Sequence, residues 1–393
     1  MPLFCFGGKW QKRFSILGLG DSITEGGKNF TSYLFPLWEK LMAGGYEFDF
    51  VGPNKSSCRI GTLDNCGFSG KTVEYLDEHI DSLYRIYPAD IVLLHAGHNH
   101  FAEEKPVKRM IEAYRSIIRK IHAINPEAKI LMAQVIESGK LPKYGYIPDL
   151  NDAIRIMVDE LNDGRVILVN QANGFDWRTM TISDKVHPNG VGAEMMASTW
   201  YDALKRILKE PSVVYNPTVF GYKAVDGRDS LKLHVFFPEE RKTEKRPAIV
   251  YFFGGGWTNG TPFQFYRECA YYASKGFVAI SADYRIRSVD RTTPYDSFED
   301  AKDVIRWIGH HSEMLGIDAE RIIVAGASAG GQLAAALGTS YTKNNEKHVP
   351  YAMLLYYPVL DTGIGSFAYD RFGKWYKDVS PIDNVTHSTP PAL

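Results

Sequence analysis

The sequence predicts an α/β protein with two domains, and three observations carry this prediction. Short apolar runs alternate with amphipathic helical patterns from residue 14 onward, the order that builds a parallel sheet covered by helices. The 393 residues exceed one ordinary core and suit two domains of about 200 residues each. After Lys209-Glu210-Pro211 the pattern changes from helix to alternating strand residues. We therefore expect an N-terminal extension at 1–13, a first domain at 14–210 and a second at 211–393.

In the first half, each short apolar run is followed by a helical pattern that glycine, asparagine or proline ends. This order predicts a doubly wound sheet, in which loops at the strand ends carry function. The predicted strands are 15–19, 48–51, 90–94, 129–135 and 166–170, and the predicted helices are 30–43, 73–86, 106–124, 149–161 and 190–208.

The second half begins differently, with two alternating segments around the turn Asp226-Gly227, which indicates an antiparallel pair. Buried strands and helices then alternate again. The predicted strands are 213–225, 230–237, 247–253, 277–282, 321–325 and 353–359, and the predicted helices are 263–275 and 295–315.

Charge and composition argue against several classes of function. The formal net charge of −1 gives no basic surface for nucleic acid or an anionic membrane, and no apolar run reaches the roughly 18 residues of a membrane span. The sequence as given lacks a signal-peptide pattern, so the compartment stays open between the cytoplasm and secretion with the signal removed. We expect no zinc site, and we favour free thiols at Cys5, Cys58, Cys66 and Cys269 over the alternative that Cys58 and Cys66 pair across a loop.

A candidate nucleophile, Ser22, lies in Gly20-Asp21-Ser22-Ile23-Thr24-Glu25-Gly26, directly after the first strand. A serine needs a base that an acid holds in place. Asp184 and His187 lie three residues apart, so one turn can bring the carboxylate to the imidazole and leave its other nitrogen free for the Ser22 proton. The pattern predicts a Ser-His-Asp triad that requires neither metal nor cofactor.

Two further motifs lie between these residues: Gly70 in Gly67-Phe68-Ser69-Gly70-Lys71-Thr72, and Asn99 in Ala96-Gly97-His98-Asn99-His100. Together the four motifs resemble the SGNH (GDSL-like) hydrolase family. The resemblance implies a flavodoxin-like three-layer domain, with Ser22 N–H, Gly70 N–H and the Asn99 amide as the oxyanion hole. His100 replaces the family's usual Asp, which leaves the geometry of that loop open.

The second half contains Gly326-Ala327-Ser328-Ala329-Gly330 after a predicted strand, the setting of a nucleophile elbow. This half resembles esterases and lipases of the α/β-hydrolase fold. The resemblance implies Ser328 as nucleophile and an oxyanion hole of Ala329, Gly255 and Gly256 N–H groups. Phe253 stands where the family's glycine-rich loop often has histidine.

In that fold the acid and histidine follow the nucleophile on later strands. Few residues follow Ser328, and none of the later acids or histidines comes after the expected strand. We therefore expect an α/β-hydrolase-like domain that lacks its last strands, has an uncovered sheet edge and is disabled as an esterase. The candidates considered are Asp361, Asp378, Asp383 and His387.

The two resemblances imply a serine esterase that resembles bifunctional carbohydrate esterases. We expect it to deacetylate xylan-like or other acetylated carbohydrates, as an acetylxylan esterase does, with Trp257 and Trp375 as candidates for stacking on sugar. The alternative is a general short-chain carboxylesterase or thioesterase whose second domain is a non-catalytic binding module. His95, His98 and His100 alternate faces without a carboxylate cluster, so no metal site is predicted.

Overall fold

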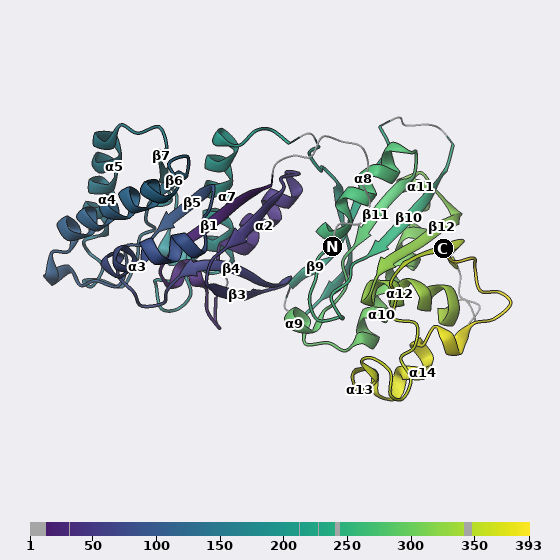
Figure 1. Cartoon of the computed structure of the whole chain (residues 1–393). Helices are drawn as coiled ribbons and strands as arrows, with labels where there is room; N and C mark the ends of the chain where they lie inside the picture. The colour runs from purple at the N-terminus through teal and green to yellow at the C-terminus, as the bar shows by residue number, and fades with distance from the viewer. Residues whose placement is uncertain (1–12, 31, 212, 227, 240–243, 342–347) are drawn as a thin grey trace. The chain divides into compact units, whose positions relative to one another are not determined.

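The computed structural model describes residues 13–30, 32–211, 213–226, 228–239, 244–341 and 348–393 (Figure 1). Nearly all of the predicted N-terminal extension, and Gly227 of the predicted turn, lie outside these residues. The chain forms two compact units that divide between Val214 and Tyr215, apart from the short segment Arg59–Gly61, which groups with the second unit. The domain boundary proposed from the sequence lies near residue 211.

The first unit is built on a seven-stranded sheet in which β1 (Phe14–Gly20) is central. The strand order is β3-β4-β1-β5-β6-β7, and β2 also pairs with β1. The pairs of β1 with β2, β4 and β5 are all parallel, as are β5–β6 and β6–β7. The other strands are β2 (Phe48–Val51), β3 (Asn54–Cys58), β4 (Gly61–Gly67), β5 (Ile91–His95), β6 (Lys129–Gln134) and β7 (Val166–Asn170).

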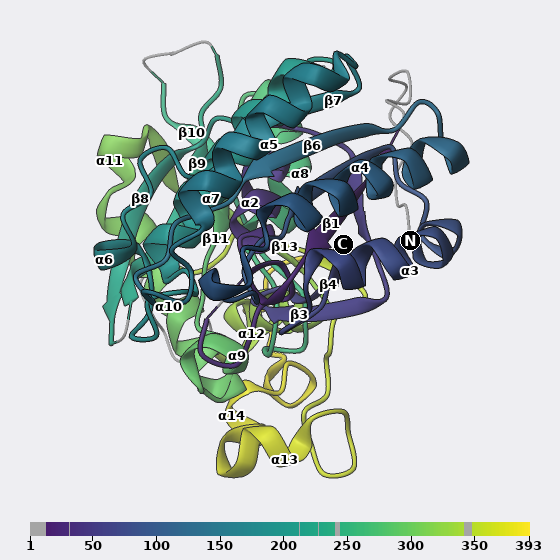
Figure 2. The same cartoon turned by 90° about the vertical axis from the view of Figure 1, so that its left-hand side faces the viewer.

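Helices cover both faces of this sheet and make three layers. The helices α3, α4 and α5 pack side by side on one face, and α2 packs with α7 on the other (Figures 1 and 2). In α4 the buried residues Met110, Tyr114, Ile117 and Ile121 recur every three or four positions, so one stripe of the helix faces the core. The helices are α1 (Ser22–Glu25), α2 (Leu34–Ala43), α3 (Val73–Ile86), α4 (Val107–Ile124), α5 (Ile147–Leu161), α6 (Trp177–Met180) and α7 (Gly190–Ile207), with a 3₁₀ turn at Ala102–Glu104.

The second unit has a six-stranded sheet in the order β13-β12-β10-β11-β9-β8. Four neighbouring strands are parallel, and β9 and β8 add an antiparallel pair at one side. The strands are β8 (Thr218–Val225), β9 (Arg228–Phe236), β10 (Arg246–Phe252), β11 (Val278–Ala282), β12 (Ile317–Ala327) and β13 (Ala352–Tyr356). The predicted α/β class, with a mostly parallel sheet in each half, is confirmed.

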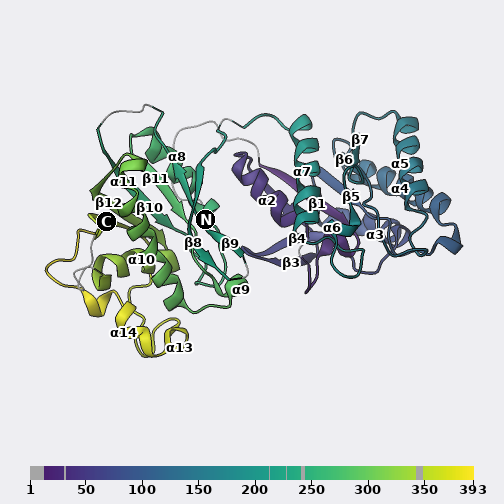
Figure 3. The same cartoon turned by 180° about the vertical axis from the view of Figure 1, so that it is seen from behind.

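Helices of the second unit pack on these strands: α8 contacts β9, β10 and β11, and α12 contacts β10, β12 and β13 (Figure 3). The helices are α8 (Tyr266–Ser274), α9 (Arg287–Asp290), α10 (Pro294–His310), α11 (Ser312–Leu315), α12 (Ala329–Ala336), α13 (Tyr369–Phe372) and α14 (Tyr376–Val379). Short 3₁₀ or π turns lie at Pro262–Phe265, Leu337–Tyr341, Gly373–Trp375 and Ile382–Asn384. No helix among the described residues is apolar over a length that could cross a bilayer.

Several elements differ from the sequence prediction. The pair β3 and β4 was not predicted, because their residues are polar and lack a clear apolar alternation. The helix predicted at 295–315 is two helices, since His311 leaves helical geometry with φ −106° and ψ 15°. The helix predicted from residue 30 begins at Leu34.

The expected bare sheet edge is wrong along β13. Met353 N–H donates to Pro391 O at 2.9 Å, and Leu393 N–H donates back to Met353 O at 3.0 Å. Leu355 N–H donates to Leu393 O at 2.9 Å. Backbone groups that a bare edge would leave to solvent are therefore paired along these residues.

Gly20→Ala should destabilise the first unit, because a Cβ at Gly20 would lie 2.2 Å from the backbone oxygen of His95. We expect a loss of about 1–3 kcal/mol, the usual range for overpacking, seen by calorimetry of the full chain as a lower unfolding midpoint. Gly164→Ala is the matched control, since a Cβ there meets no atom within 4 Å. Equal midpoints for the two variants would contradict the close approach of β1 to β5.

Candidate active site

The structure brings Ser22, His187 and Asp184 together in one hydrogen-bonded series. Ser22 Oγ lies 2.8 Å from His187 Nε2, and His187 Nδ1 lies 2.5 Å from Asp184 Oδ2. Ser22 begins α1, directly after the central strand β1, and the other two residues lie in the loop before α7. This is the geometry in which a histidine can take a serine proton while a carboxylate orients its ring.

Local hydrogen bonds fix the turn that carries Ser22. Asp21 caps α1, because its Oδ1 accepts the Ile23 N–H at 3.0 Å. Gly26 ends the turn with φ 81°, a left-handed conformation that glycine adopts without strain, and its N–H donates to Ser22 O at 2.9 Å. The serine is therefore held at both ends of a single helical turn.

The Asp184 loop is equally ordered by its own side chain. Asp184 Oδ1 accepts the N–H groups of Val186 at 2.9 Å and His187 at 3.0 Å, which leaves Oδ2 for the imidazole. Burial raises the pKa of Asp184, but the hydrogen bonds from His187 and Val186 outweigh burial and hold the pKa below its ordinary value. Asp184 is thus ionised at neutral pH and can stabilise a protonated His187.

The residues predicted for the oxyanion hole follow three adjacent strands in the order β4-β1-β5. Phe68 N–H donates to Gly20 O at 3.0 Å, and Ser69 N–H donates to Glu25 Oε2 at 2.6 Å, so the Gly70 loop is tied to the turn of Ser22. Asn99 Nδ2 donates to Lys71 O at 3.0 Å and joins the third loop to the second.

Gly70 and Ser22 keep their backbone donors available. Within the described residues, neither the Ser22 N–H nor the Gly70 N–H donates to another protein group. Gly70 has φ 74°, and a Cβ built there would meet no atom within 4 Å, so the space beside it is open. Backbone donors without a protein acceptor, one of them on a glycine with open space beside it, can bind a developing oxyanion.

His100, which replaces the usual Asp of the SGNH pattern, anchors the Asn99 loop through a different set of contacts. Its Nε2 lies 2.9 Å from Glu74 Oε2 and its Nδ1 lies 3.2 Å from Glu104 Oε2. Its backbone N–H donates to Tyr146 Oη at 3.3 Å, and Tyr146 donates to Gly97 O at 2.8 Å. The loop geometry that the sequence left open is therefore supplied by a buried histidine between two carboxylates.

This cluster around His100 was not predicted from the sequence, and Arg109 completes it with its Nε 3.1 Å from Glu74 Oε1. The only signal for Glu104 and Arg109 was their position soon after His100 in the chain. Glu74 lies on α3 and carried no signal, because its contact with His100 depends on how α3 packs beside the β5 loop.

The other two histidines of this region are buried behind the site. His95 Nε2 accepts the Ile136 N–H at 3.3 Å, and burial lowers the pKa of His95 to about 4, so its ring is neutral. His98 Nδ1 lies 3.7 Å from Asp21 Oδ2, and its ring packs edge-on against Tyr144. In the part of the chain that the structure describes, no group of three or more potential ligands could hold a metal ion.

In the second unit, Ser328 lies between β12 and α12 in a strained backbone conformation, with φ 52° and ψ −115°. Non-glycine residues rarely adopt this conformation, and it is the sharp strand-to-helix turn that a nucleophile elbow requires. Gly330 makes the turn compatible with the neighbouring strand, because a Cβ there would lie 2.1 Å from Phe252 O. The Ser328 side chain is half-buried.

The glycine-rich loop lies directly beside this serine, since a Cβ built on Gly254 would lie 3.5 Å from Ser328 Cβ. Gly255 and Gly256, two of the predicted oxyanion donors, follow Gly254 in this loop. The third, Ala329, begins α12 directly after the serine. Arg371 Nη1 donates to Gly256 O at 2.6 Å and fixes the orientation of that peptide.

Phe253, at the position where the family often has histidine, anchors this loop by stacking. Its ring lies 4.0 Å from the Tyr284 ring at an interplanar angle of 13°, and Tyr284 Oη donates to Phe253 O at 2.6 Å. Loop anchoring is thus kept although the residue type differs.

Ser328 has no base or acid beside it among the described residues. Its Oγ makes no hydrogen bond there, and His387 is exposed. Asp361 Oδ1 accepts the Gly363 N–H at 2.7 Å, while Asp378 and Asp383 are exposed. The structure thus places Ser328 beside Gly254 of the glycine-rich loop, and among the described residues its Oγ makes no hydrogen bond to any of the four acid or histidine candidates.

Of the two tryptophans considered for sugar stacking, Trp257 is buried and Trp375 stacks on a neighbouring ring. Trp257 is fully buried and packs edge-on against Phe372, so its prediction is wrong. Trp375 is 38% exposed, but its ring stacks on Tyr295 at 4.5 Å, and Lys374 Nζ lies 4.7 Å from its centroid.

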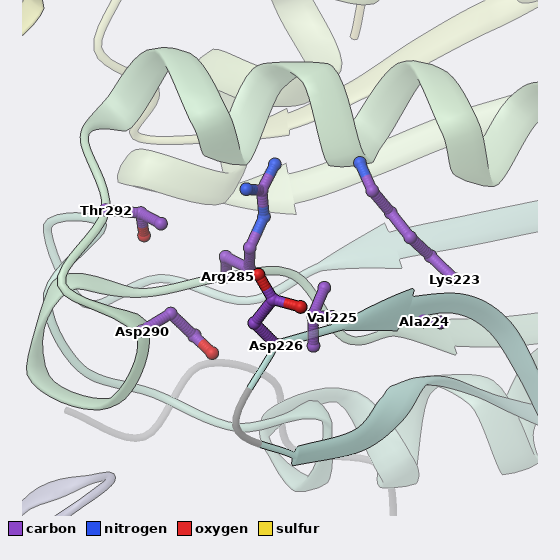
Figure 4. A pocket seen from close by; sticks show the side chains of 7 residues that line it. All are labelled: Lys223, Ala224, Val225, Asp226, Arg285, Asp290 and Thr292. Carbon is purple, nitrogen blue, oxygen red and sulfur yellow. The ribbon is translucent and has the colours of Figure 1, made fainter.

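A polar cavity of about 460 Å³ lies in the second unit near the β8–β9 turn, away from the residues predicted for catalysis (Figure 4). In Figure 4, Lys223 and Arg285 reach toward α10, where Asp300 neutralises both at 2.7 and 2.8 Å. None of the predicted site residues is among its lining residues, which are Lys223, Ala224, Val225, Asp226, Arg285, Asp290 and Thr292.

Each of the two α/β units thus has a serine at a turn that leads from a strand into a helix. Residues 19–195 match the model of the GDSL-like Lipase/Acylhydrolase family, and residues 233–372 match the BD-FAE model. The predicted arrangement, an SGNH (GDSL-like) domain followed by an esterase domain of the α/β-hydrolase type, is confirmed.

Similar proteins are esterases. Ethyl acetate hydrolase of Pseudomonas putida is 31% identical over 140 residues, which cover 35% of this chain and 43% of the relative. Carboxylesterase NlhH of Mycobacterium tuberculosis is 29% identical over 184 residues, which cover 42% of this chain and 55% of the relative. The chain spans about half the length of the curated relatives it matches. The apo structure of Thermogutta terrifontis esterase 2 is 36% identical in sequence. The match covers 47% of this chain and 73% of that one, with a TM-score of 0.42.

Glu74→Gln should make the first unit less sensitive to acid. Burial raises the pKa of Glu74, but the hydrogen bond and charge interaction with His100, together with hydrogen bonds to the Glu74 backbone and to Thr72, outweigh burial and lower the pKa from 4.5 to about 2. A carboxylate with a lowered pKa contributes stability above pH 4.5, and this contribution disappears as the pH falls toward 2.

The unfolding midpoint of the wild type should therefore fall more steeply between pH 4.5 and 2 than that of Glu74→Gln. Glu78→Gln, an exposed carboxylate on the same helix, is the control and should follow the wild type. Parallel curves for wild type and Glu74→Gln would contradict the role given to the His100 contact.

Proposed function

We propose that this chain is a serine carboxylesterase whose Ser22 site hydrolyses short-chain, chiefly acetyl, esters. The observation that carries the proposal is the hydrogen-bonded series from Ser22 Oγ through His187 to an ionised Asp184. Matches to a lipase/acylhydrolase family and to named esterases support the same reaction class.

In the proposed reaction, Ser22 Oγ attacks the ester carbonyl while His187 Nε2 takes the hydroxyl proton. The carbonyl oxygen becomes an oxyanion, and the N–H groups of Ser22 and Gly70 and the Asn99 amide donate hydrogen bonds to it. We expect these donors to supply the largest part of the rate enhancement, since they are positioned before the reaction begins.

The tetrahedral intermediate then collapses, the C–O bond to the alcohol breaks, and His187 gives its proton to the departing alkoxide. Water attacks the acyl-enzyme with His187 again as base, which releases the acid and restores Ser22. Throughout, Asp184 keeps its charge and stabilises the imidazolium of His187. The proposed steps use only these side chains and water.

As substrate we propose acetylated carbohydrates of the xylan type. Support comes from the pairing of two esterase-type domains on one chain, which suits a decorated polysaccharide, and from the similarity to a protein named for ethyl acetate hydrolysis. The second candidate is a general short-chain carboxylesterase or thioesterase, which the named carboxylesterase relative favours.

For the second domain we propose a non-catalytic role in substrate binding or positioning. The observation behind this proposal is that, in the described residues, Ser328 Oγ has neither histidine nor carboxylate within hydrogen-bonding distance. The strained turn and the oxyanion loop remain and could hold an ester carbonyl without cleaving it.

Ser22→Ala should abolish acetate release from acetylated xylan by the full chain, whereas Ser328→Ala should leave it nearly unchanged. Loss of a triad nucleophile lowers the rate by on the order of 10⁴- to 10⁶-fold, well outside experimental scatter. Full activity in Ser22→Ala would refute the proposed site. Loss of activity in Ser328→Ala would show that the second domain is catalytic.

A series of p-nitrophenyl esters separates the two substrate classes. For a site selective for acetyl groups, kcat/KM should fall as the acyl chain lengthens from acetyl to octanoyl. A preference for octanoyl would favour the general esterase and count against the carbohydrate proposal. Ser22→Ala is the blank for each ester.

A further inference from the structure

The base of the proposed triad is covered by an aromatic ring that the reaction scheme above does not use. The Phe30 ring stacks on the His187 imidazole, with centroids 4.2 Å apart and an interplanar angle of 25°. We propose that Phe30 is a positioning residue that holds His187 in line with Ser22 and stabilises its protonated form during the reaction. This inference rests on the proposed function of the Ser22 site.

Phe30 is fixed by the segment that leaves the nucleophile turn. Gly27 N–H donates to Phe30 O at 3.1 Å, which closes the loop after α1. A Cβ built on Gly27 would lie 2.6 Å from Phe30 Cε1, so the ring lies directly against the Gly27 backbone. One short stretch of chain therefore carries both the nucleophile and the ring that covers its base.

Three contacts now fix the imidazole. Ser22 Oγ is hydrogen-bonded to His187 Nε2, and the Asp184 carboxylate is hydrogen-bonded to His187 Nδ1. The Phe30 ring covers one face of the imidazole. The imidazole can turn about its Cβ–Cγ bond, and such a turn carries both nitrogens away from Ser22 and Asp184. The Phe30 ring, stacked on one face of the imidazole, opposes this turn and helps to keep Nε2 aimed at Ser22.

The stacking of Phe30 on His187 also stabilises the positive charge that His187 gains during the reaction. An aromatic face carries negative electrostatic potential and attracts a cation within about 6 Å of its centroid. His187 is neutral before attack and becomes an imidazolium as Ser22 loses its proton. The Phe30 ring therefore interacts more strongly with His187 in the transition state than in the ground state, which is the condition for raising kcat.

The contact is not one that core packing demands. The His187 side chain is 22% exposed and Phe30 is only half-buried, so both rings lie at the surface of the site. Neither residue belongs to the described hydrophobic core of this unit. A residue that only filled space would lie deeper, where burial of its ring contributes most to stability.

The test measures kcat and KM for p-nitrophenyl acetate with full-length Phe30→Leu and Phe30→Tyr. Leucine keeps an apolar cover but removes the aromatic face, and tyrosine keeps the face. We expect kcat of Phe30→Leu to fall roughly 2- to 5-fold or more, with KM little changed, the effect of losing one exposed cation–π contact. Phe30→Tyr should restore kcat to near the wild-type value.

Phe35→Leu is the matched control. Phe35 is a half-buried aromatic residue of the same unit that stacks on Trp38 and contacts no proposed site residue. It should keep wild-type kcat, and thermal unfolding of all variants shows whether Phe30→Leu is folded at the assay temperature. If Phe30→Leu is unfolded at the assay temperature, the test rests on Phe30→Tyr, which keeps the aromatic ring. A reduced kcat in folded Phe30→Tyr would overturn the inference.

Other outcomes separate this inference from the proposed function. Wild-type kcat in Phe30→Leu, or a rise in KM alone, would overturn the role of Phe30 while Ser22→Ala still confirms the site. Hydrolysis that is equal in wild type and Ser22→Ala would overturn the proposed function and this inference together. Loss of kcat in Phe30→Leu with recovery in Phe30→Tyr supports both.

Discussion

The candidate active site depends on the close parallel pairing of β1 with β4 and β5. At the end of β1, Gly20 is in register with Gly67 on one side and with His95 on the other. Because the three strands end at the same edge, the loops that follow them lie next to one another. Those loops carry Ser22, the Gly70 turn and the Asn99 turn, so the position of the nucleophile and of the oxyanion donors follows from one register.

In both units a loop of the candidate site is held in place by a residue type that differs from the one usual at that position in the resembled family. In the first unit a buried histidine between two carboxylates, His100, replaces an aspartate and ties down the Asn99 loop. In the second, Phe253 stacks on Tyr284 where a histidine is usual, and the tyrosine hydroxyl bonds the loop backbone. Hydrogen bonding to carboxylates and aromatic stacking can each serve here, because each needs only to hold a backbone segment in place.

The two serines differ in what surrounds them. Ser22 has a histidine at hydrogen-bonding distance, and that histidine is oriented by a carboxylate and covered by a ring. Ser328 has the strained turn and the adjacent glycine-rich loop, but in the described residues no base contacts it. A strained turn exposes the serine hydroxyl. Activation of that hydroxyl as a nucleophile needs a base, which comes from another segment of the fold.

The sequence by itself determined the features that depend on near neighbours in the chain. The periodicity of apolar residues predicted most strands and helices to within a few positions, and the Asp184–His187 spacing predicted a contact between carboxylate and imidazole that one turn can close. Only the tertiary structure decided which distant segments meet. The contact of Glu74 with His100, the burial of Trp257 and the stacking of Phe30 on His187 all depend on how loops and helices pack. Such contacts join residues whose separation in the chain leaves no periodic or local signal.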